Sequence, residues 1–312
     1  MTPELAPVVW LLHDDRRGHQ VQLKGLGNRL NARANAQIFW IDCTTTKVSL
    51  WRFLLGLPPT LETPEPYIKP DLIIGAGSQT HRLLASLRRK RSAHTAILMR
   101  PSFPKGWVKS RIIPAHDGVE EDRDTLVTQG VLNTQTPMAH LTNKHHALIL
   151  VGGPSKHFNW NGDAVLQQVD HLCQRYPQWR WTVSSSRRTP VEMIDALSRR
   201  AGPNLLFRDH RETHANWLAH TLAGCRAAWI TPDSVSMVYE SLTAGIPTAL
   251  FDLAAKPYSR VARGVETLRR NGRVGHIEAA EAIMGDNSPR PKALWEADRA
   301  ARWLLERWRS AQ

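Results

Sequence analysis

The chain has 312 residues, 42% of them hydrophobic and 22% charged, which are the values of ordinary globular domains and exclude a wholly disordered chain or a coiled coil. Lys and Arg number 41 against 28 Asp and Glu, and the net charge of +13 favours an anionic partner such as a nucleotide, a nucleic acid or an acidic membrane surface. The sequence has no apolar run near the roughly 20 residues of a membrane span and no basic start of a signal peptide, so we expect a cytoplasmic protein. Its length favours two domains. Its three cysteines form no CxxC pair, and we expect them to be inert.

In the first half, short β-rich runs alternate with segments of helical period, the pattern of a parallel sheet covered by helices. We predict strands over residues 8–14, 37–42, 71–77, 95–100, 111–117 and 124–130, and helices over 20–34 and 78–91. The stretch 48–57, VSLWRFLLGL, is more apolar than a loop needs. We interpret it as a buried helix, because large exposed apolar patches are uncommon; the alternative is an exposed patch for a membrane or a partner.

The second half repeats this alternation after a polar stretch, 131–146, that we interpret as a linker. We predict strands over 147–153, 180–186, 204–207, 227–231 and 248–252, and helices over 161–175, 190–201, 213–223, 234–244 and 259–271. An apolar stripe predicts one more helix over 291–309, docked on a domain surface.

The expected fold is α/β and GT-B-like, with two Rossmann-type domains whose parallel sheets face a central cleft. The expected parts are an N-terminal domain over 1–140, a C-terminal domain over 141–290 and a helical segment over 291–312.

Ligands of open parallel sheets bind beyond the carboxyl ends of the strands, so the residues after each predicted strand are informative. After the first strand, DDRRGHQVQ (14–22) begins a helix whose N-terminus attracts anions, and its His19 can exchange a proton near neutral pH. Our candidates for a general base are His19, then Asp15, then Asp117 of PAHDG. The alternative is a capped helix with a solvated histidine. The glycines of GAGSQTH (75–81) are interpreted as mainly structural, since a dinucleotide fingerprint is absent.

In the second half, VGGPSKHFNW (151–160) places two glycines, Gly152 and Gly153, together with Ser155 and Lys156 after a predicted strand. These residues suit a phosphate, but the Gly-Lys-Ser/Thr ending of a Walker loop is absent. We therefore favour a nucleoside diphosphate over ATP hydrolysis.

Two further loops complete a predicted nucleotide cradle: SSSRRTP (184–190) and the stretch TPDSVSMVYESLTAGIP. In the second of these, Ser234 and Ser236 after Asp233 can cap a helix, whose first-turn N–H groups would meet a phosphate. Glu240, about two turns further on, can accept both hydroxyls of a ribose. The alternative is a capped helix with an exposed Glu.

The ordered motifs resemble a known family, the plant mitochondrial-fission (elongated mitochondria) proteins and their bacterial relatives, which are regarded as GT-B glycosyltransferases. The likeness spans residues 8–252 and is carried by GHQVQ, PDLIIGAG, RPSFP, IIPAHDG, GVLN, LVGGPSKHFNW, SSSRRTP and TPDSVSMVYESLTAGIP. The last motif is also similar to the donor-binding segment of the peptidoglycan GlcNAc transferase, in which a Glu shortly before Ala-Gly-x-Pro binds the donor ribose. Glu240 precedes Ala244-Gly245-Ile246-Pro247 in the same way.

The resemblance implies roles for particular residues. Gly153, Ser155 and Lys156 would line the donor diphosphate, Ser186 and Arg187 would flank it, and Ser234 and Ser236 would lie at the distal phosphate. Gly152, Ser185, Asp233 and Glu240 complete the expected donor-binding set. Gly18 and His19 would face the acceptor. At this place the transferase has a glycine-rich loop, whereas this chain has Arg16 and Arg17, which suggest an anionic acceptor or donor sugar.

We therefore expect an inverting, metal-independent glycosyltransferase with no bound cofactor and a nucleotide-sugar as co-substrate. The expected acceptor is an envelope glycolipid, reached by a cytoplasmic protein that is peripheral on the anionic inner face of the membrane. Two alternatives stay open: a nucleotide-sugar 2-epimerase of the same fold, and a noncatalytic adaptor related to the mitochondrial-fission proteins. Specific nucleic-acid binding is not expected, because the basic residues are scattered and form no known module.

Overall fold

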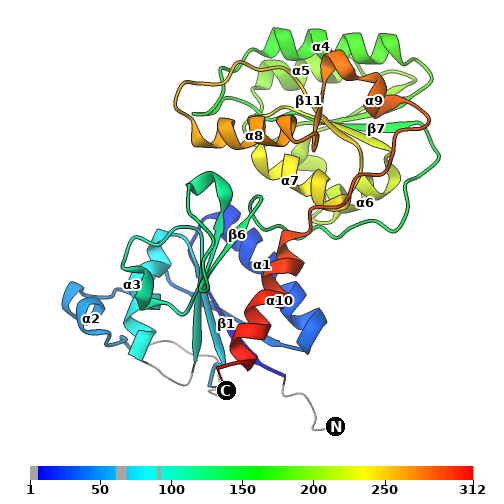
Figure 1. Cartoon of the computed structure of the whole chain (residues 1–312). Coiled ribbons are helices and arrows are strands. Elements are labelled where there is room, and N and C mark those ends of the chain that lie inside the picture. Colours follow the sequence, from blue (N-terminus) through cyan, green and yellow to red (C-terminus); the bar gives the residue numbers. More distant parts are fainter. Residues whose placement is uncertain (1–5, 61–68, 90–92, 312) are drawn as a thin grey trace. The chain divides into compact units, whose positions relative to one another are not determined.

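The computed structural model describes residues 6–60, 69–89 and 93–311, and the chain forms two compact units (Figure 1). The N-terminal unit contains residues 1–134 and 295–312, and the C-terminal unit contains residues 135–294. Each unit has one six-stranded parallel sheet covered by helices. The predicted α/β class with two Rossmann-type domains is confirmed.

The sheet of the N-terminal unit has the strand order β2-β1-β3-β4-β5-β6, with every neighbouring pair parallel. Its strands are β1 (Val8–His13), β2 (Gln37–Asp42), β3 (Leu72–Ala76), β4 (His94–Leu98), β5 (Ser110–Pro114) and β6 (Thr125–Thr128). Its α-helices are α1 (Arg17–Ala34), α2 (Leu50–Leu55), α3 (Ser78–Ser86) and α10 (Glu296–Arg309). All residues of β3 and β4 are buried, because helices cover both faces of a parallel sheet.

Helix α10 belongs to the N-terminal core although it lies at the end of the sequence. Its Ala300 and Leu304 pack in the same apolar cluster as Leu26 of α1. Asp298 of α10 accepts hydrogen bonds from Arg29 and Arg33 of α1, and the Arg29 contact is 2.9 Å. Burial raises the pKa of Asp298, but the hydrogen bonds from the two arginines outweigh it and hold that pKa below its usual range.

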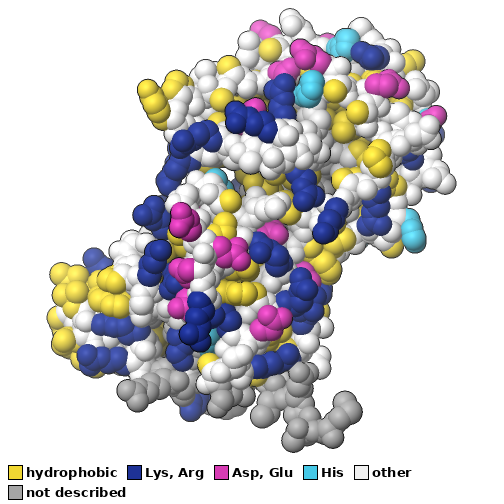
Figure 2. All heavy atoms as spheres, viewed as in Figure 1, with side chains coloured by type: hydrophobic (Ala, Val, Ile, Leu, Met, Phe, Trp, Pro, Cys, Tyr) yellow, Lys and Arg dark blue, Asp and Glu magenta, His cyan; other side chains and the backbone are white. Residues whose placement is uncertain are grey.

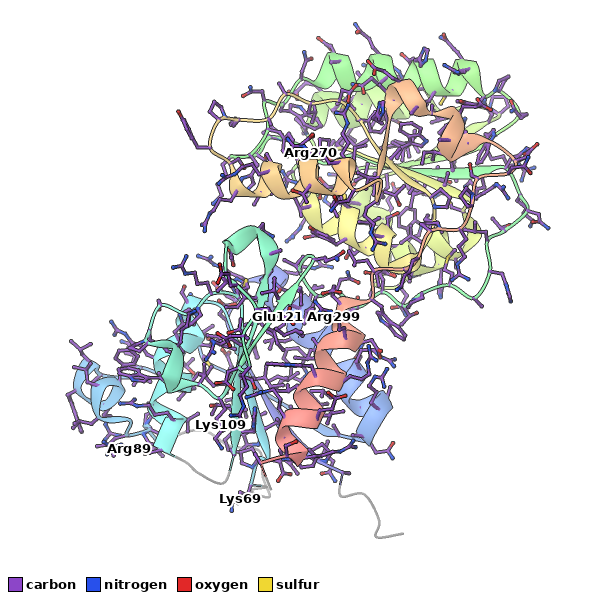
Figure 3. The ribbon with its side chains drawn as sticks, in the orientation of Figure 1. Lys69, Arg89, Lys109, Glu121, Arg270 and Arg299 are labelled. Carbon is purple, nitrogen blue, oxygen red and sulfur yellow. The ribbon has the colours of Figure 1, made fainter. Side chains whose placement is uncertain are left out.

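A second ion pair fixes the start of α10 and involves Arg299, which Figure 3 labels on this helix. Glu296 lies 2.8 Å from Arg299 and also accepts the backbone N–H of Gln129, just after β6, at 3.1 Å. The helix is therefore tied to the sheet through its charged face as well as its apolar face.

The sheet of the C-terminal unit has the order β12-β11-β10-β7-β8-β9, and its neighbouring strands are also parallel. Its strands are β7 (His146–Leu150), β8 (Arg180–Ser184), β9 (Leu205–Arg208), β10 (Ala227–Ile230), β11 (Thr248–Leu250) and β12 (Gly275–His276). Its α-helices are α4 (Gly162–Arg175), α5 (Val191–Arg199), α6 (Trp217–Gly224), α7 (Val235–Ala244), α8 (Arg260–Arg270) and α9 (Glu281–Met284). The short elements β12 and α9 were not predicted, because so few residues carry no readable period.

The prediction for the stretch 48–57 is wrong in one respect. It does form a helix, α2, but no residue of that helix is buried. Trp51 and Leu54 are each 54% exposed, and only Phe53 turns inward, where its ring lies 5.1 Å from that of Trp107. An apolar count shows that a segment is hydrophobic but not whether another element covers it.

Burial makes the cysteines unreactive, as expected. It raises the pKa values of Cys43, Cys173 and Cys225 to about 12, so few thiolates form near neutral pH. None of the described helices combines the length and the apolar character that crossing a bilayer requires.

A buried histidine makes the stability of the N-terminal unit depend on pH. His94 Nε2 hydrogen bonds with Ser110 Oγ at 2.8 Å, whereas Nδ1 is buried and has no hydrogen-bond partner in the part of the chain that the structure describes. Burial lowers the pKa of His94 to about 4. Between pH 6.5 and 4 the unfolded chain therefore binds the extra proton, and the free energy of unfolding falls as the pH falls, by up to about 1.4 kcal/mol per pH unit.

We predict that His94→Gln, which cannot titrate and can still hydrogen bond with Ser110, shows a smaller fall in unfolding free energy between pH 7 and pH 5. Urea unfolding at a series of pH values measures this. Equal pH slopes for the wild type and the variant would show that His94 is not the source.

Candidate functional site

The N-terminal unit carries an Asp–His pair at the carboxyl end of β1. Asp14 is fully buried, and its two carboxylate oxygens lie 2.9 and 2.8 Å from Nδ1 of His19 in the first turn of α1. One of these oxygens also accepts the backbone N–H of Arg16 at 3.1 Å. A carboxylate only accepts hydrogen bonds, so Nδ1 carries the proton and Nε2 of the neutral ring keeps a free lone pair. This is the arrangement of a general base oriented by an acid.

The pair requires a glycine opposite it. Gly77, directly after β3, has φ of +88°, and a Cβ there would lie 2.2 Å from His19 Nδ1 and 2.4 Å from Asp14 Oδ2. Any side chain would displace the pair. The glycine of GAGSQTH therefore makes room for a functional group, in agreement with its structural interpretation.

A second histidine lies close enough to interact electrostatically with His19. Nδ1 of His81 accepts hydrogen bonds from the hydroxyl and the backbone N–H of Ser102, at 2.7 and 3.2 Å. Burial lowers the pKa of His81, and His19 lowers it further when it is protonated. Because Nδ1 accepts the N–H of Ser102, the proton of the neutral His81 ring is on Nε2. Sequence reasoning missed His81, although it is the last residue of GAGSQTH (75–81), because that motif was interpreted as mainly structural.

The structure does not bring the other predicted residues of this unit to His19. Asp15 is exposed, and the residue that pairs with His19 is its neighbour Asp14. Arg16, Arg17 and Gly18 are also exposed. Asp117 follows β5, which is three positions from β1 in the sheet and therefore about 14 Å away along it. Asp15 instead lines a separate 590 Å³ pocket together with Lys47 and Arg82.

In the C-terminal unit, the two glycines after β7 are packed against neighbouring loops. The N–H of Gly152 donates to Thr231 Oγ1 at 2.7 Å, and that of Gly153 donates to Asp233 Oδ2 at 3.0 Å. A Cβ on Gly152 would lie 2.2 Å from Asp233, and one on Gly153 would lie 1.9 Å from the carbonyl oxygen of Arg188. Close packing is thus the reason for both glycines.

A buried ion pair ties these loops together. Arg188 lies 2.7 Å from Asp233, whose side chain is 1% exposed, whereas that of Arg188 is 40% exposed. The same guanidinium donates to the carbonyl oxygens of Gly153 and Pro154 at 3.0 and 3.1 Å. The second carboxylate oxygen of Asp233 is buried without a hydrogen-bond partner within the described ranges. The arginine in this pair is Arg188, and its predicted neighbour Arg187 is exposed.

Several hydroxyls predicted to bind a phosphate are used inside the loops. Ser155 Oγ accepts the N–H groups of His157 and Phe158, at 3.1 and 3.2 Å. Ser185 is buried, and its Oγ accepts the N–H of His210 at 2.9 Å. The hydroxyl of Ser186 accepts the N–H of Arg188 at 3.3 Å. Of the residues predicted to bind the donor in the loops 151–160 and 184–190, Lys156 and Arg187 are exposed and able to contact a ligand.

Helix α7 leaves its first turn without a side-chain cap. Ser234 occupies the N-cap position, but its side chain makes no capping hydrogen bond, and Ser236 is exposed. The predicted capping by these serines is therefore wrong. The N–H groups of the first turn keep their capacity to bind an anion. Glu240 lies half-buried on the same helix.

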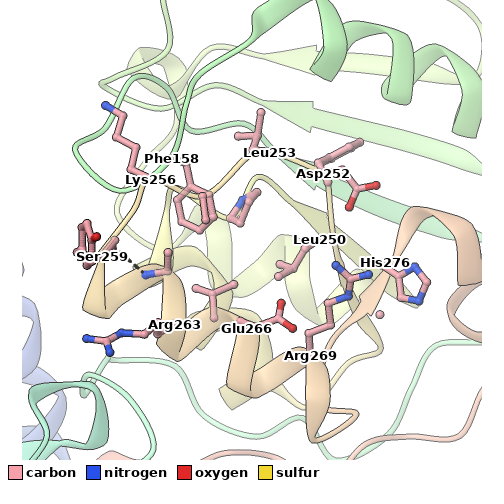
Figure 4. Close-up of a pocket in the computed structure, with 17 residues that line it drawn as sticks. Phe158, Leu250, Asp252, Leu253, Lys256, Ser259, Arg263, Glu266, Arg269 and His276 are labelled. Carbon is pink, nitrogen blue, oxygen red and sulfur yellow. Dashed lines mark hydrogen bonds between the residues drawn. The ribbon is translucent and has the colours of Figure 1, made fainter.

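A pocket of 260 Å³ lies beyond the carboxyl ends of β10, β11 and β12 (Figure 4). Its floor is apolar, formed by Phe158, Leu250, Phe251, Ala262 and Val265. Its rim carries charged groups, from Asp252, Lys256, Arg263, Glu266, Arg269 and His276. An apolar floor with a few polar groups at the rim is typical of a site for a small molecule.

This pocket is continuous with the loop after β7. Lys256 Nζ donates to the carbonyl oxygen of Ser155 at 2.9 Å, and the ring of His157 hydrogen bonds with Ser259 Oγ at 3.0 Å. Sequence reasoning missed the pocket. The available signal was the spacing of Arg263, Glu266 and Arg269, which places three charged side chains on one face of α8.

Over the residues that the structure describes, no group of three or more His, Cys, Asp and Glu side chains could hold a metal ion.

Comparison with known proteins agrees with this architecture. A family model described as "Mitochondrial fission ELM1" matches residues 17–308. No curated protein sequence matches the chain significantly. Among solved structures, a Listeria monocytogenes protein provisionally described as a UDP-N-acetylglucosamine 2-epimerase is similar with a TM-score of 0.61 and 10% identity, over 99% of this chain and 98% of that one.

Two further structures show the same fold. UDP-GlcNAc 2-epimerase from Neisseria meningitidis, bound to UDP-GlcNAc, has a TM-score of 0.53 at 10% identity over 96% of this chain and 98% of its own. MurG from Acinetobacter baumannii has a TM-score of 0.52 at 11% identity over 98% of this chain and 100% of its own. At such low identity these similarities show the fold, which is that of the GT-B enzymes.

The unequal burial of Arg188 and Asp233 generates a prediction about stability. Arg188→Gln leaves a buried carboxylate without its cation, and we expect the free energy of unfolding to fall by about 3 kcal/mol. Asp233→Asn removes the charge, keeps an acceptor for Gly153 and leaves Arg188 in contact with water, so the expected loss is about 1 kcal/mol.

Arg187→Gln is the matched control, because Arg187 is exposed and we expect a change within about 0.5 kcal/mol. Urea unfolding followed by circular dichroism measures all three variants. Equal losses for Arg187→Gln and Arg188→Gln would contradict the assigned role of the ion pair.

Proposed function

The chain belongs to the mitochondrial fission ELM1 family, and from this membership, its GT-B fold and its two sites we propose that it transfers a sugar from a nucleotide-activated donor to an acceptor hydroxyl. The observation that carries the proposal is the pairing of Asp14 with His19, 2.8 Å apart, directly after β1. It supplies an oriented base, which is what the acceptor hydroxyl requires.

The C-terminal unit supports the binding of a nucleoside diphosphate. The exposed cations Lys156 and Arg187 and the uncapped first turn of α7 suit the phosphates. Glu240 is assigned to the ribose hydroxyls. The pocket with the apolar floor is assigned to an uncharged part of the donor. The Neisseria meningitidis epimerase is a structure of similar fold bound to UDP-GlcNAc, which supports a donor of this class.

The reaction we propose is a single displacement, which inverts the anomeric centre. The acceptor oxygen attacks the anomeric carbon, its proton passes to Nε2 of His19, and the bond between that carbon and the phosphate oxygen breaks. The electron pair leaves with the nucleoside diphosphate. Lys156 and Arg187 stabilise the added negative charge, so this scheme assigns no step to a metal ion. A membrane glycolipid is the proposed acceptor class, in keeping with the net charge of +13.

A 2-epimerase is the second candidate, and one observation favours it. Such an enzyme needs acidic groups near the sugar carbon and no acceptor, and Asp252 and Glu266 are on the rim of the pocket. The TM-score of 0.61 with the Listeria monocytogenes protein supports the same candidate.

Donor binding is the first test. We expect calorimetry with UDP, GDP, ADP, dTDP, CMP and their sugars to show saturable binding of one nucleotide. Glu240→Gln should weaken that binding by about tenfold, because one acceptor for the ribose hydroxyls becomes an amide. Glu192→Gln, a change at an exposed residue of α5, is the matched control and should bind as the wild type does. If no nucleotide binds at millimolar concentration, the proposal fails and a noncatalytic adaptor takes its place.

The role of His19 is tested with the donor found in this way. Asp14→Asn should lower kcat by about 10²- to 10⁴-fold with little change in donor binding, because the ring loses its orientation and its tautomer. Asp15→Asn is the control, since Asp15 is exposed and does not contact His19. Equal rates for both Asp variants would remove His19 from the mechanism.

A separate experiment distinguishes the transferase from the epimerase. The donor is incubated with the protein without any acceptor, and its sugar is then examined by nuclear magnetic resonance. A transferase leaves the donor sugar unchanged, whereas an epimerase converts it.

A further inference from the structure

Helix α2 and the residue after it present a continuous apolar surface, formed by Leu50, Trp51, Leu54, Leu55 and Leu57. We call it the α2 surface. Its side chains are between 40% and 59% exposed, and they make up five of the nine exposed large hydrophobic side chains in the described ranges. Figure 2 shows hydrophobic side chains gathered over α2, with Lys and Arg side chains beside them. Exposed patches of this kind mark interaction sites.

The exposure of the α2 surface is held in place by the fold. The guanidinium of Arg88, in the 3₁₀-helix η1 (Leu87–Arg89), donates to the carbonyl oxygens of Phe53 and Leu54 at the end of α2. The same guanidinium stacks 4.1 Å above the ring of Trp107. Gly56 ends the helix in the left-handed conformation, and a Cβ there would lie 2.9 Å from Arg88. The helix is therefore fastened by its backbone and by Phe53, with its leucines outward.

Three described segments that include the α2 surface or contact α2 carry one sign of charge. Residues 43–60, 78–89 and 100–111 contain no Asp or Glu. Their exposed cations are Lys47, Arg82, Arg89, Arg100, Lys105 and Lys109. Trp107, which packs against Phe53, belongs to the last of these segments. Over these three described segments, an apolar surface has cations beside it and no acidic side chain, which is complementary to a surface that is apolar inside and anionic outside.

We propose that the α2 surface docks the protein on an anionic lipid bilayer. The leucines enter the boundary between headgroups and acyl chains, and Trp51 lies at the level of the headgroups, as amphipathic rings do. The surrounding cations contact lipid phosphates. A bilayer fits better than a helix-binding groove of another protein, because α2 has six residues and a groove reads anchors spaced over two turns.

Flotation of the full chain with lipid vesicles tests the proposal. The wild type should float with phosphatidylcholine vesicles that contain phosphatidylglycerol and not with phosphatidylcholine alone, and added salt should weaken the binding. Leu54→Ser/Leu55→Ser should lower the partition coefficient by roughly tenfold or more. Arg89→Gln should lower it by about fivefold through charge alone. Lipid binding is measured without any sugar nucleotide, so its failure and a failure of sugar transfer are separate results.

The matched control changes two exposed apolar residues of the C-terminal unit, Val191→Ser/Leu206→Ser, and should float as the wild type does. Equal midpoints of thermal unfolding show that each variant is folded. The proposal is overturned if the wild type does not float with the anionic vesicles or if the double leucine variant floats equally well. It is also overturned if sedimentation without lipid shows a dimer that this variant abolishes, since a second copy of the chain would then cover the surface.

Discussion

A buried carboxylate facing a glycine organises the carboxyl edge of each sheet. Asp14 follows β1, Asp233 follows β10, and in both units the glycine comes after the neighbouring strand of the sheet. A Cβ would lie 2.4 Å from Asp14 Oδ2 at Gly77 and 2.2 Å from Asp233 Oδ2 at Gly152. Neither carboxylate reaches water, so each must be compensated by a neighbour that the fold supplies. The loops at both edges are shaped around this requirement.

The two units satisfy the requirement with partners of different chemistry. Asp14 accepts a hydrogen bond from Nδ1–H of His19, and the result is an oriented imidazole whose Nε2 keeps its lone pair. Asp233 takes a permanent cation, Arg188, and the result is a rigid set of loops with the charge of that arginine already compensated. An anionic ligand of the C-terminal unit must therefore bind to other positively charged groups. These are exposed side chains such as Lys156 and the uncapped N-terminus of α7. The same device orients a reactive group in one unit and builds a scaffold in the other.

The fold could be predicted from the sequence to a large extent, whereas the site could be predicted only to the level of its loops. Buried parallel strands are continuous apolar runs, and the carboxyl-end rule places the loops that follow them at one edge. The choice between Asp14 and Asp15, or between Arg187 and Arg188, was out of reach. Adjacent residues in a loop point in different directions, and packing against a distant strand decides which of them turns inward. The serines of these loops have the same ambiguity, because a hydroxyl serves a turn as well as it serves a phosphate.

Net charge and apolar content have a similar limit, because both describe a chain and not its surfaces. Many of the arginines that make the chain basic are engaged inside the fold: Arg29 and Arg33 on Asp298, Arg200 on Asp170, and Arg88 on the carbonyl oxygens of α2. The charge excess that reaches a partner is therefore local. One such place is beside α2, where the segments 43–60, 78–89 and 100–111, which have no acidic residue, leave the leucines of that helix exposed. The coincidence matters physically, because attraction to phosphates falls off within about 10 Å and assists apolar contacts only when both arise at the same place.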